Sequence, residues 1–280
     1  MSDDDRPRVP HPRNDNRPPA DAAAFGREVV HEIVGGLRFY SRVPIGFVPY
    51  VPPELTRLAP VLPGVSLILG LVPAALLVVF TYCGLPSVYA AGIAVAFSLV
   101  LTGAMAEDAL ADAFDGLFGG PSPEVRLDIM RDSRHGTYGV SALVLLLLLR
   151  VFAIGGIAAI HPFAGAAAWL ASGILARSGS LWLPLALPPA RATGVSAAAG
   201  RVKPPAFWVG AAIALVLCVA LAVPFAGVAG VVVALVLAGL TVILWTWICR
   251  RLIGGQTGDC VGALQALIEI AVLSVFFAFA

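Results

Sequence analysis

The stretch TGAMAEDALADAFDG, residues 102–116, places four carboxylates directly after 49 residues (58–106) that carry no charge. The four are Glu107, Asp108, Asp112 and Asp115. The last three recur at i, i+4 and i+7, so a helix puts them on one face, where like charges repel each other. Near hydrocarbon such groups need a partner or a cation. The pattern predicts a site for a hard divalent ion, most simply Mg²⁺ shared with a substrate phosphate; a solvated acidic helix end is the alternative.

The composition is that of an integral membrane protein. Of 280 residues, 59% are hydrophobic and only 12% are charged, and the mean hydropathy is +0.91. These values are far from those of soluble domains. The net charge of +1 excludes the basic surface of a nucleic-acid-binding protein. The four cysteines and four histidines have the spacing of neither a disulfide framework nor a zinc site.

Hydrophobic patterning predicts an all-α fold, a polytopic integral membrane bundle of about seven transmembrane helices. Residues 1–24 are polar and are expected to form a disordered tail, and residues 25–280 a single membrane-embedded catalytic domain. The segment 25–42 is predicted to be an amphipathic helix lying in the membrane interface. The expected spans are 58–80, 87–106, 139–160, 163–187, 206–223, 228–247 and 261–280.

The basic residues predict the topology. Sixteen of the 18 lysines and arginines fall outside the spans. All sixteen lie on one side if the tail and segments 107–138, 188–205 and 248–260 share that side. Because such segments face the cytoplasm, we expect a multi-pass protein of the bacterial cytoplasmic (inner) membrane. Its site would face the cytoplasm and Ala280 the outside.

A second polar cluster, EVRLDIMRDSRHGTYG, occupies residues 124–139. It interleaves Arg126, Arg131 and Arg134 with two aspartates, which favours either mutual salt bridges or a clamp of guanidinium groups on a diphosphate. The two glycines that flank Thr137 and Tyr138 would let backbone amides approach a phosphate closely.

Charged residues also occur inside apolar segments, where an unpaired charge is costly. For Arg177 the two interpretations are a phosphate ligand and a cation that snorkels to the interface. For Arg150 we expect a structural partner such as Glu269. The last cluster, GGQTGDCVGALQALIE (254–269), opens with residues suited to a helix N-cap and first turn. Gly262, Gln265 and Glu269 then share one helix face.

Three motifs together resemble the cobalamin synthase family, the adenosylcobinamide-GDP ribazoletransferases. They are TGAMAEDALADAFDG, MRDSRHGTYG and GGQTGD-x-x-GA-x-x-x-x-x-E, in the order in which the family carries them. FYSRVP near the start, Arg177 and Arg191-x-x-Gly194 fit the same pattern, so the resemblance covers residues 37–270.

The resemblance implies a membrane-bound, Mg²⁺-dependent transferase of the last steps of cobalamin biosynthesis. It would join adenosylcobinamide-GDP to α-ribazole or its 5′-phosphate and release GMP. The expected partners are the corrinoid nucleotide, α-ribazole and membrane lipid, with no nucleic acid. A second copy of the chain, or other enzymes of the pathway, are the protein partners that it suggests.

The family's functional motifs can be carried over to this chain. The acidic motif falls on Glu107, Asp108, Asp112 and Asp115, the D-S-R motif on Asp132, Ser133 and Arg134, and the late motif on Thr257, Gly258 and Asp259. Mg²⁺ would lie on Asp108, Asp112 and Asp115. Phosphate oxygens would be held by Arg126, Arg131 or Arg134, and Glu107 or Asp132 would act as the base. Ser133, Arg126, Arg177 and the late motif would bind substrate, all three clusters meeting in one pocket.

Two departures from the family pattern bear on the choice of base. Ala106 stands where the family usually has histidine, and Ala109 where it usually has glycine. A metaphosphate-like transition state needs little help from a base, so activity can survive the change. The alternative functions are a secondary transporter, a non-catalytic scaffold and a CDP-alcohol-type phosphotransferase. The last is disfavoured because its D-G-x-x-A-R opening is absent.

Overall fold

The computed structural model describes residues 22–45, 54–132, 134–191 and 200–280. Within these ranges the chain forms helices and no β-strand, which confirms the predicted all-α class. Most of the predicted tail and Ser133 lie outside the described residues. The first described helix, α1 (Ala22–Tyr40), begins inside the segment assigned to the tail.

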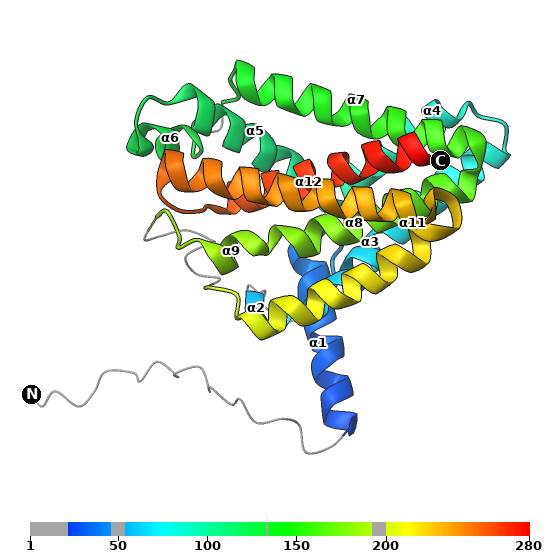
Figure 1. The fold of residues 1–280 in the computed structure, drawn as a ribbon, viewed down its shortest axis with the longest axis horizontal. Helices are drawn as coiled ribbons and strands as arrows, with labels where there is room; N and C mark the ends of the chain where they lie inside the picture. Colours follow the sequence, from blue (N-terminus) through cyan, green and yellow to red (C-terminus); the bar gives the residue numbers. More distant parts are fainter. Residues whose placement is uncertain (1–21, 46–53, 133, 192–199) are drawn as a thin grey trace, which may run out of the picture.

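The bundle is built from long apolar helices that run roughly side by side (Figure 1). They are α3 (Leu62–Tyr82), α4 (Ser87–Thr102), α5 (Met105–Gly119), α7 (Thr137–Ile160), α8 (Pro162–Ser180), α11 (Pro204–Ile253) and α12 (Gly258–Phe279). Three short helices, α2 (Leu55–Leu58), α6 (Pro123–Ile129) and α9 (Trp182–Ala186), lie toward one end (Figure 1).

By length and composition, four of the described helices can cross a membrane: α3, α7, α11 and α12. A fifth span results if α4 and α5, which meet at a bend of 85°, count as one broken helix. The predicted count of seven is therefore not confirmed. The largest departure is in 87–106, where α4 stops at Thr102 after 16 residues, fewer than the roughly 20 that cross hydrocarbon.

The bend between α4 and α5 is made by two consecutive left-handed residues. Gly103 has φ 65° and Ala104 has φ 53°, and Ala104 is the one non-glycine residue with positive φ among the described positions. The backbone N–H of Arg42 donates to the Leu101 carbonyl at 2.8 Å. A Cβ on Gly103 would lie 2.3 Å from Arg42 Nε. The bend thus packs against the segment that follows α1. It also places the acidic residues on a helix, α5, that is separate from α4.

Helix α11 is interrupted at Gly227, whose φ of 66° and ψ of 175° belong to a region open only to glycine. Its two halves run in opposite directions (Figure 1, yellow and orange). They correspond to the predicted spans 206–223 and 228–247. The reversal places Ile253 at the same end of the bundle as Pro204.

Helix α12 packs against α5, α7, α8 and α11. Where α12 meets α5, a Cβ on Gly262 would lie 2.5 Å from the Cβ of Ala109. Such close backbone approach through small residues is typical of helix packing in membranes. The contact brings the start of α12 beside the acidic face of α5.

The polar segments gather at one end of the bundle (Figure 1). Arg126 Nη1 donates to the Leu252 carbonyl at 2.9 Å, and Arg191 Nη2 donates to the Leu127 carbonyl at 2.6 Å. The Gln256 N–H donates to the Pro188 carbonyl at 2.9 Å. Ala280 lies at the opposite end (Figure 1). The described parts of the three polar segments therefore lie at one end of the bundle.

Helix α1 projects away from the bundle at a steep angle (Figure 1). Its last residue, Tyr40, is buried, whereas Val30 is exposed. Arg57 of α2 pairs with Glu54 at 3.3 Å and with Glu28 of α1 at 3.6 Å. The end of α1 is thus part of the core.

The geometry at Gly227 makes a stability prediction. Gly227→Ala should destabilise the protein by about 1–3 kcal/mol, because an L-residue is strained at this φ and ψ, although a Cβ there has open space. Gly239→Ala is the control. A Cβ on Gly239 also has open space, but this residue is helical, so alanine there should stabilise the protein slightly. Thermal unfolding in detergent measures both. Equal melting temperatures for the two variants would contradict the prediction.

Candidate active site

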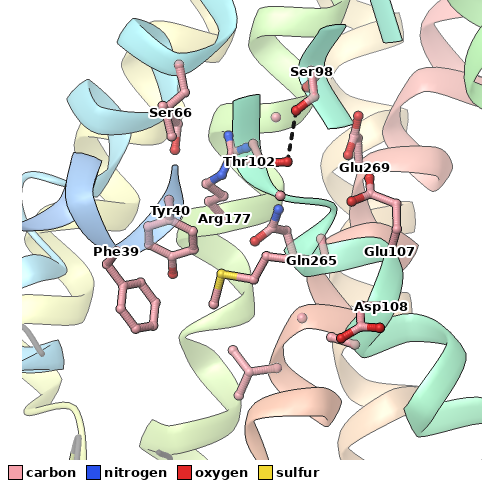
Figure 2. A pocket seen from close by; sticks show the side chains of 18 of the residues that line it. Phe39, Tyr40, Ser66, Ser98, Thr102, Glu107, Asp108, Arg177, Gln265 and Glu269 are labelled. Carbon is pink, nitrogen blue, oxygen red and sulfur yellow. Dashed lines mark hydrogen bonds between the residues drawn. The ribbon is translucent and has the colours of Figure 1, made fainter. Parts of the chain in front are cut away.

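A cavity of about 320 Å³ lies between α1, α3, α5, α8 and α12 (Figure 2). Charged side chains from three of these helices, α5, α8 and α12, line it, together with apolar and aromatic ones. They are Glu107, Asp108, Arg177, Asp259 and Glu269, with Arg42 from beyond α1 and Arg150 from α7.

The three aspartates of the predicted metal site have different surroundings. Asp108 is exposed and lines the cavity, whereas Asp112 is half-buried outside it. Asp112 Oδ1 lies 3.8 Å from His135 Nδ1. The charges of Asp108 and Asp259 both act on Asp112. Asp108 and Asp112 therefore belong to one acidic region, but of the three predicted metal ligands Asp108 alone lines the cavity.

Asp115 has a structural role. Its carboxylate is buried and accepts the N–H groups of Gly136 at 2.6 Å and Gly139 at 2.8 Å, at the N-terminus of α7. A Cβ on Gly139 would lie 2.3 Å from Asp115 Oδ2. The glycines whose amides were expected to approach a phosphate thus approach a carboxylate of the chain, where the helix dipole favours negative charge.

The late motif both caps its helix and reaches the cavity. Thr257 Oγ1 accepts the Cys260 N–H at 3.2 Å and donates to Asp259 Oδ2 at 3.2 Å, which is the predicted N-cap. Gly258 and Asp259 line the same cavity as Asp108. Gly262, Gln265 and Glu269 line it as well. The late motif and Asp108 thus share one cavity, but the predicted meeting of all three clusters in one pocket is wrong, because Arg126, Arg131 and Arg134 do not line it.

No group of three or more His, Cys, Asp or Glu side chains within the described ranges has an arrangement that could hold a metal ion. Mg²⁺ commonly takes only one or two protein carboxylates and completes its shell with water and substrate phosphate. Asp108 and Asp112 fit that mode. With both its oxygens engaged, Asp115 does not.

A buried ion cluster forms the inner wall of the cavity. Arg150 Nη1 donates to Glu107 Oε1 at 2.5 Å, and Arg150 Nη2 donates to Glu269 Oε2 at 2.9 Å. The three residues are 4–6% exposed. The expected Arg150–Glu269 partnership is confirmed. Glu107, one of the two predicted bases, is held by the same guanidinium.

Arg177 lies in the cavity, between Tyr40 and Thr102 in Figure 2. Its guanidinium lies over the Tyr40 ring, 5.8 Å from the ring centre. Its Nε is buried and has no hydrogen-bond partner among the described residues. The side chain thus lies within the bundle, as the phosphate-ligand interpretation requires, rather than extending to the interface.

The arginine cluster of residues 126–134 lies outside the cavity. Arg134 Nη2 donates to Asp132 Oδ2 at 2.6 Å, and hydrogen bonds from Arg134 lower the pKa of Asp132 to about 2. This is the mutual salt bridge that the sequence left open. Arg126 is bonded to the end of α11, and Arg131 is exposed.

The sequence reasoning gave no role to Tyr40 and Arg42, which line the cavity from the end of α1. The only signal for them was the motif FYSRVP at 39–44. Periodicity could not assign them to the site, because they end the segment 25–42, which was expected to be an amphipathic helix in the membrane interface.

The fold and the cavity define a helical membrane protein with a charged site enclosed near one end of the bundle. The sequence model of the family described as Cobalamin-5-phosphate synthase matches residues 32–277. The chain belongs to this family.

Curated relatives agree with this assignment. The adenosylcobinamide-GDP ribazoletransferase of Azorhizobium caulinodans is 43% identical over 249 residues, which cover 88% of this chain and 94% of that protein. The protein of the same name from Sinorhizobium sp is 38% identical over 257 residues, covering 89% and 97%. No solved structure matches the chain.

The ion cluster makes a second stability prediction. Arg150→Met should cost about 3–5 kcal/mol, because it leaves two carboxylates buried without a cation. Adding Glu107→Gln and Glu269→Gln should restore most of that loss. Arg57→Met, which removes an exposed ion pair, should cost less than about 1 kcal/mol. Denaturation in detergent measures all three, and similar losses in the two single variants would refute the assignment.

Proposed function

We propose that this chain is a Mg²⁺-dependent adenosylcobinamide-GDP ribazoletransferase, which joins adenosylcobinamide-GDP to α-ribazole or its 5′-phosphate and releases GMP. The observation that carries the proposal is the meeting of Asp108, Asp259 and Arg177 in one cavity, in a chain whose relatives bear that name. Family membership decides against the transporter, scaffold and CDP-alcohol phosphotransferase interpretations.

The reaction is a phosphoryl transfer without a protein nucleophile. A ribose hydroxyl oxygen attacks the phosphorus that carries the cobinamide, and a new P–O bond forms. The bond from that phosphorus to the bridging oxygen breaks, and GMP leaves with the electron pair. Positioning and charge stabilisation contribute most of the catalysis in such reactions.

The hydroxyl proton needs an acceptor in the cavity. Glu107 is bonded to Arg150, and Asp132, with a pKa of about 2, is a weak base. We therefore assign the proton to Asp259, which lines the cavity beside Asp108. This assignment replaces the two bases favoured from the sequence.

Asp108 and Asp112 would hold Mg²⁺, with the remaining positions left to water and to oxygens of the diphosphate. The ion would neutralise the charge that develops on the departing phosphate. The phosphate-binding roles expected of Arg131, Arg134 and Ser133 stay proposals, confined to the part of the substrate outside the cavity.

The location follows from charge asymmetry. The described basic loops share one end of the bundle (Figure 1), and the positive-inside rule places that end in the cytoplasm. We propose a multi-pass protein of the bacterial inner membrane with its active site facing the cytoplasm, where a nucleotide substrate is available.

Activity tests the function directly. Purified protein given adenosylcobinamide-GDP, α-ribazole and Mg²⁺ should release GMP. Chelation should abolish release and added Mg²⁺ should restore it. Asp108→Asn and Asp112→Asn should each lower turnover by about 10²- to 10³-fold, because charge stabilisation at the diphosphate is lost.

Asp128→Asn is the matched control, because Asp128 is exposed on α6 and outside the cavity. It should retain turnover. Failure of the wild-type protein to release GMP would contradict the proposed function. Full activity of Asp112→Asn would contradict the metal assignment alone.

Labelling tests the topology. The sole exposed cysteine in the described ranges, Cys83, is removed by Cys83→Ser. In that background a membrane-impermeant maleimide should label Ala280→Cys in intact cells and Arg251→Cys only after permeabilisation. The reverse pattern would place the basic loops outside.

A further inference from the structure

The cavity has two ends of different chemistry. Asp108 and Asp259 lie at one end, where α5 and α12 begin. Arg177, whose Nε is buried, lies beside Tyr40 and away from the exposed Asp108 (Figure 2). We call the part of the cavity around Arg177 its deep end. Apolar and aromatic side chains also line the cavity, among them Phe39, Leu69, Trp169, Leu170 and Leu181. Polar groups lie near Arg177 too, including Thr102 (Figure 2).

Two cations that line this cavity, Arg42 and Arg177, have no ion pair among the described residues, and of the two Arg177 has a buried Nε. Arg150 donates to both buried glutamates, so their oxygens are already engaged. Those glutamates act on Arg177 through their charge, but its Nε is buried without a hydrogen-bond partner among the described residues, and the guanidinium lies over the Tyr40 ring. A buried N–H group without an acceptor is costly. The planar fork of the guanidinium matches the oxygens of a phosphate.

The volume of the cavity limits which of the two substrates can enter it whole. At about 320 Å³ it lies at the lower limit of small-molecule sites. A corrinoid nucleotide is several times larger than a nucleoside and cannot enter whole, whereas a benzimidazole riboside is of suitable size. In such a riboside the 5′ position lies across the ribose from the 2′ and 3′ hydroxyls. A hydroxyl placed near Asp108 and Asp259 therefore directs the 5′ substituent toward the deep end.

We propose that the deep end of the cavity is the acceptor subsite and that Arg177 binds the acceptor's 5′-phosphate, so that Arg177 sets the preference for the phosphorylated acceptor over α-ribazole itself. This inference rests on the proposed function. The aromatic wall packs on the benzimidazole, and the corrinoid stays outside with only its diphosphate at the carboxylates.

Steady-state GMP release with each acceptor tests the assignment. The wild-type protein should show a kcat/KM at least about tenfold higher for the phosphorylated acceptor. Arg177→Met should lower that value by about 10- to 100-fold, the range for hydrogen bonds to charged groups. It should leave the value for α-ribazole within about threefold, and the KM for adenosylcobinamide-GDP unchanged.

Two variants sharpen the comparison. Arg177→Lys should keep part of the preference, because it retains the charge but loses the fork. Arg42→Met removes a cation that also lines the cavity and should leave the preference intact. An equal loss with both acceptors, or a raised KM for the corrinoid, would overturn the proposal. So would a wild-type protein without any preference.

Binding without turnover separates this inference from the proposed function. α-Ribazole 5′-phosphate should raise the melting temperature of the wild-type protein more than α-ribazole does, and Arg177→Met should abolish the difference. If GMP is never released but this difference is seen, the proposed function fails and the subsite stands. Equal shifts in the two proteins would overturn the subsite.

Discussion

The structure depends on one guanidinium held between two carboxylates inside an apolar bundle. Arg150 joins α7 to Glu107 of α5 and to Glu269 of α12. Helices in a membrane gain little from hydrophobic burial against each other, so packing of small residues and polar contacts determine how they associate. In this cluster, loss of the cation leaves two charges in a medium that cannot solvate them. The cluster therefore fixes the relation of the three helices that carry the acidic stretch and the late motif.

The bend at Gly103 and Ala104 makes this cluster possible. A straight continuation of α4 would carry Asp108 away from the bundle axis, whereas the 85° bend lays α5 along α12 and α7. Asp115 secures the other end of α5 by accepting two amides at the start of α7. Glu107 and Asp115 thus hold α5, and with it Asp108, in place. Of the four carboxylates in the acidic stretch, two serve the fold.

Hydrophobic periodicity and charge predicted several features of the fold from the sequence. The ends of α3, α7 and α12 fall within a few residues of the expected spans. The i, i+4, i+7 spacing predicted a shared metal site, but of its three aspartates Asp108 alone lines the cavity. The break inside 87–106 could not be predicted, because its left-handed alanine looks like any other residue of an apolar run. Spacing also could not reveal that α7 would occupy Asp115, since that depends on a helix that begins more than twenty residues later.

Charged side chains that are already bonded within the protein are not available to a substrate. Arg126 and Arg134, expected to clamp a diphosphate, are bonded to a helix end and to Asp132. Both buried glutamates are bonded to Arg150. Of the charged side chains that line the cavity, Asp108, Asp259, Arg42 and Arg177 have no ion pair within the described ranges. Asp108 and Asp259 lie at one end of the cavity and Arg177 at the other. A ligand that satisfies both ends must present a cation-bridged phosphate to the carboxylates and an anion to the guanidinium. A phosphorylated nucleoside attacking a metal-bound diphosphate meets both requirements.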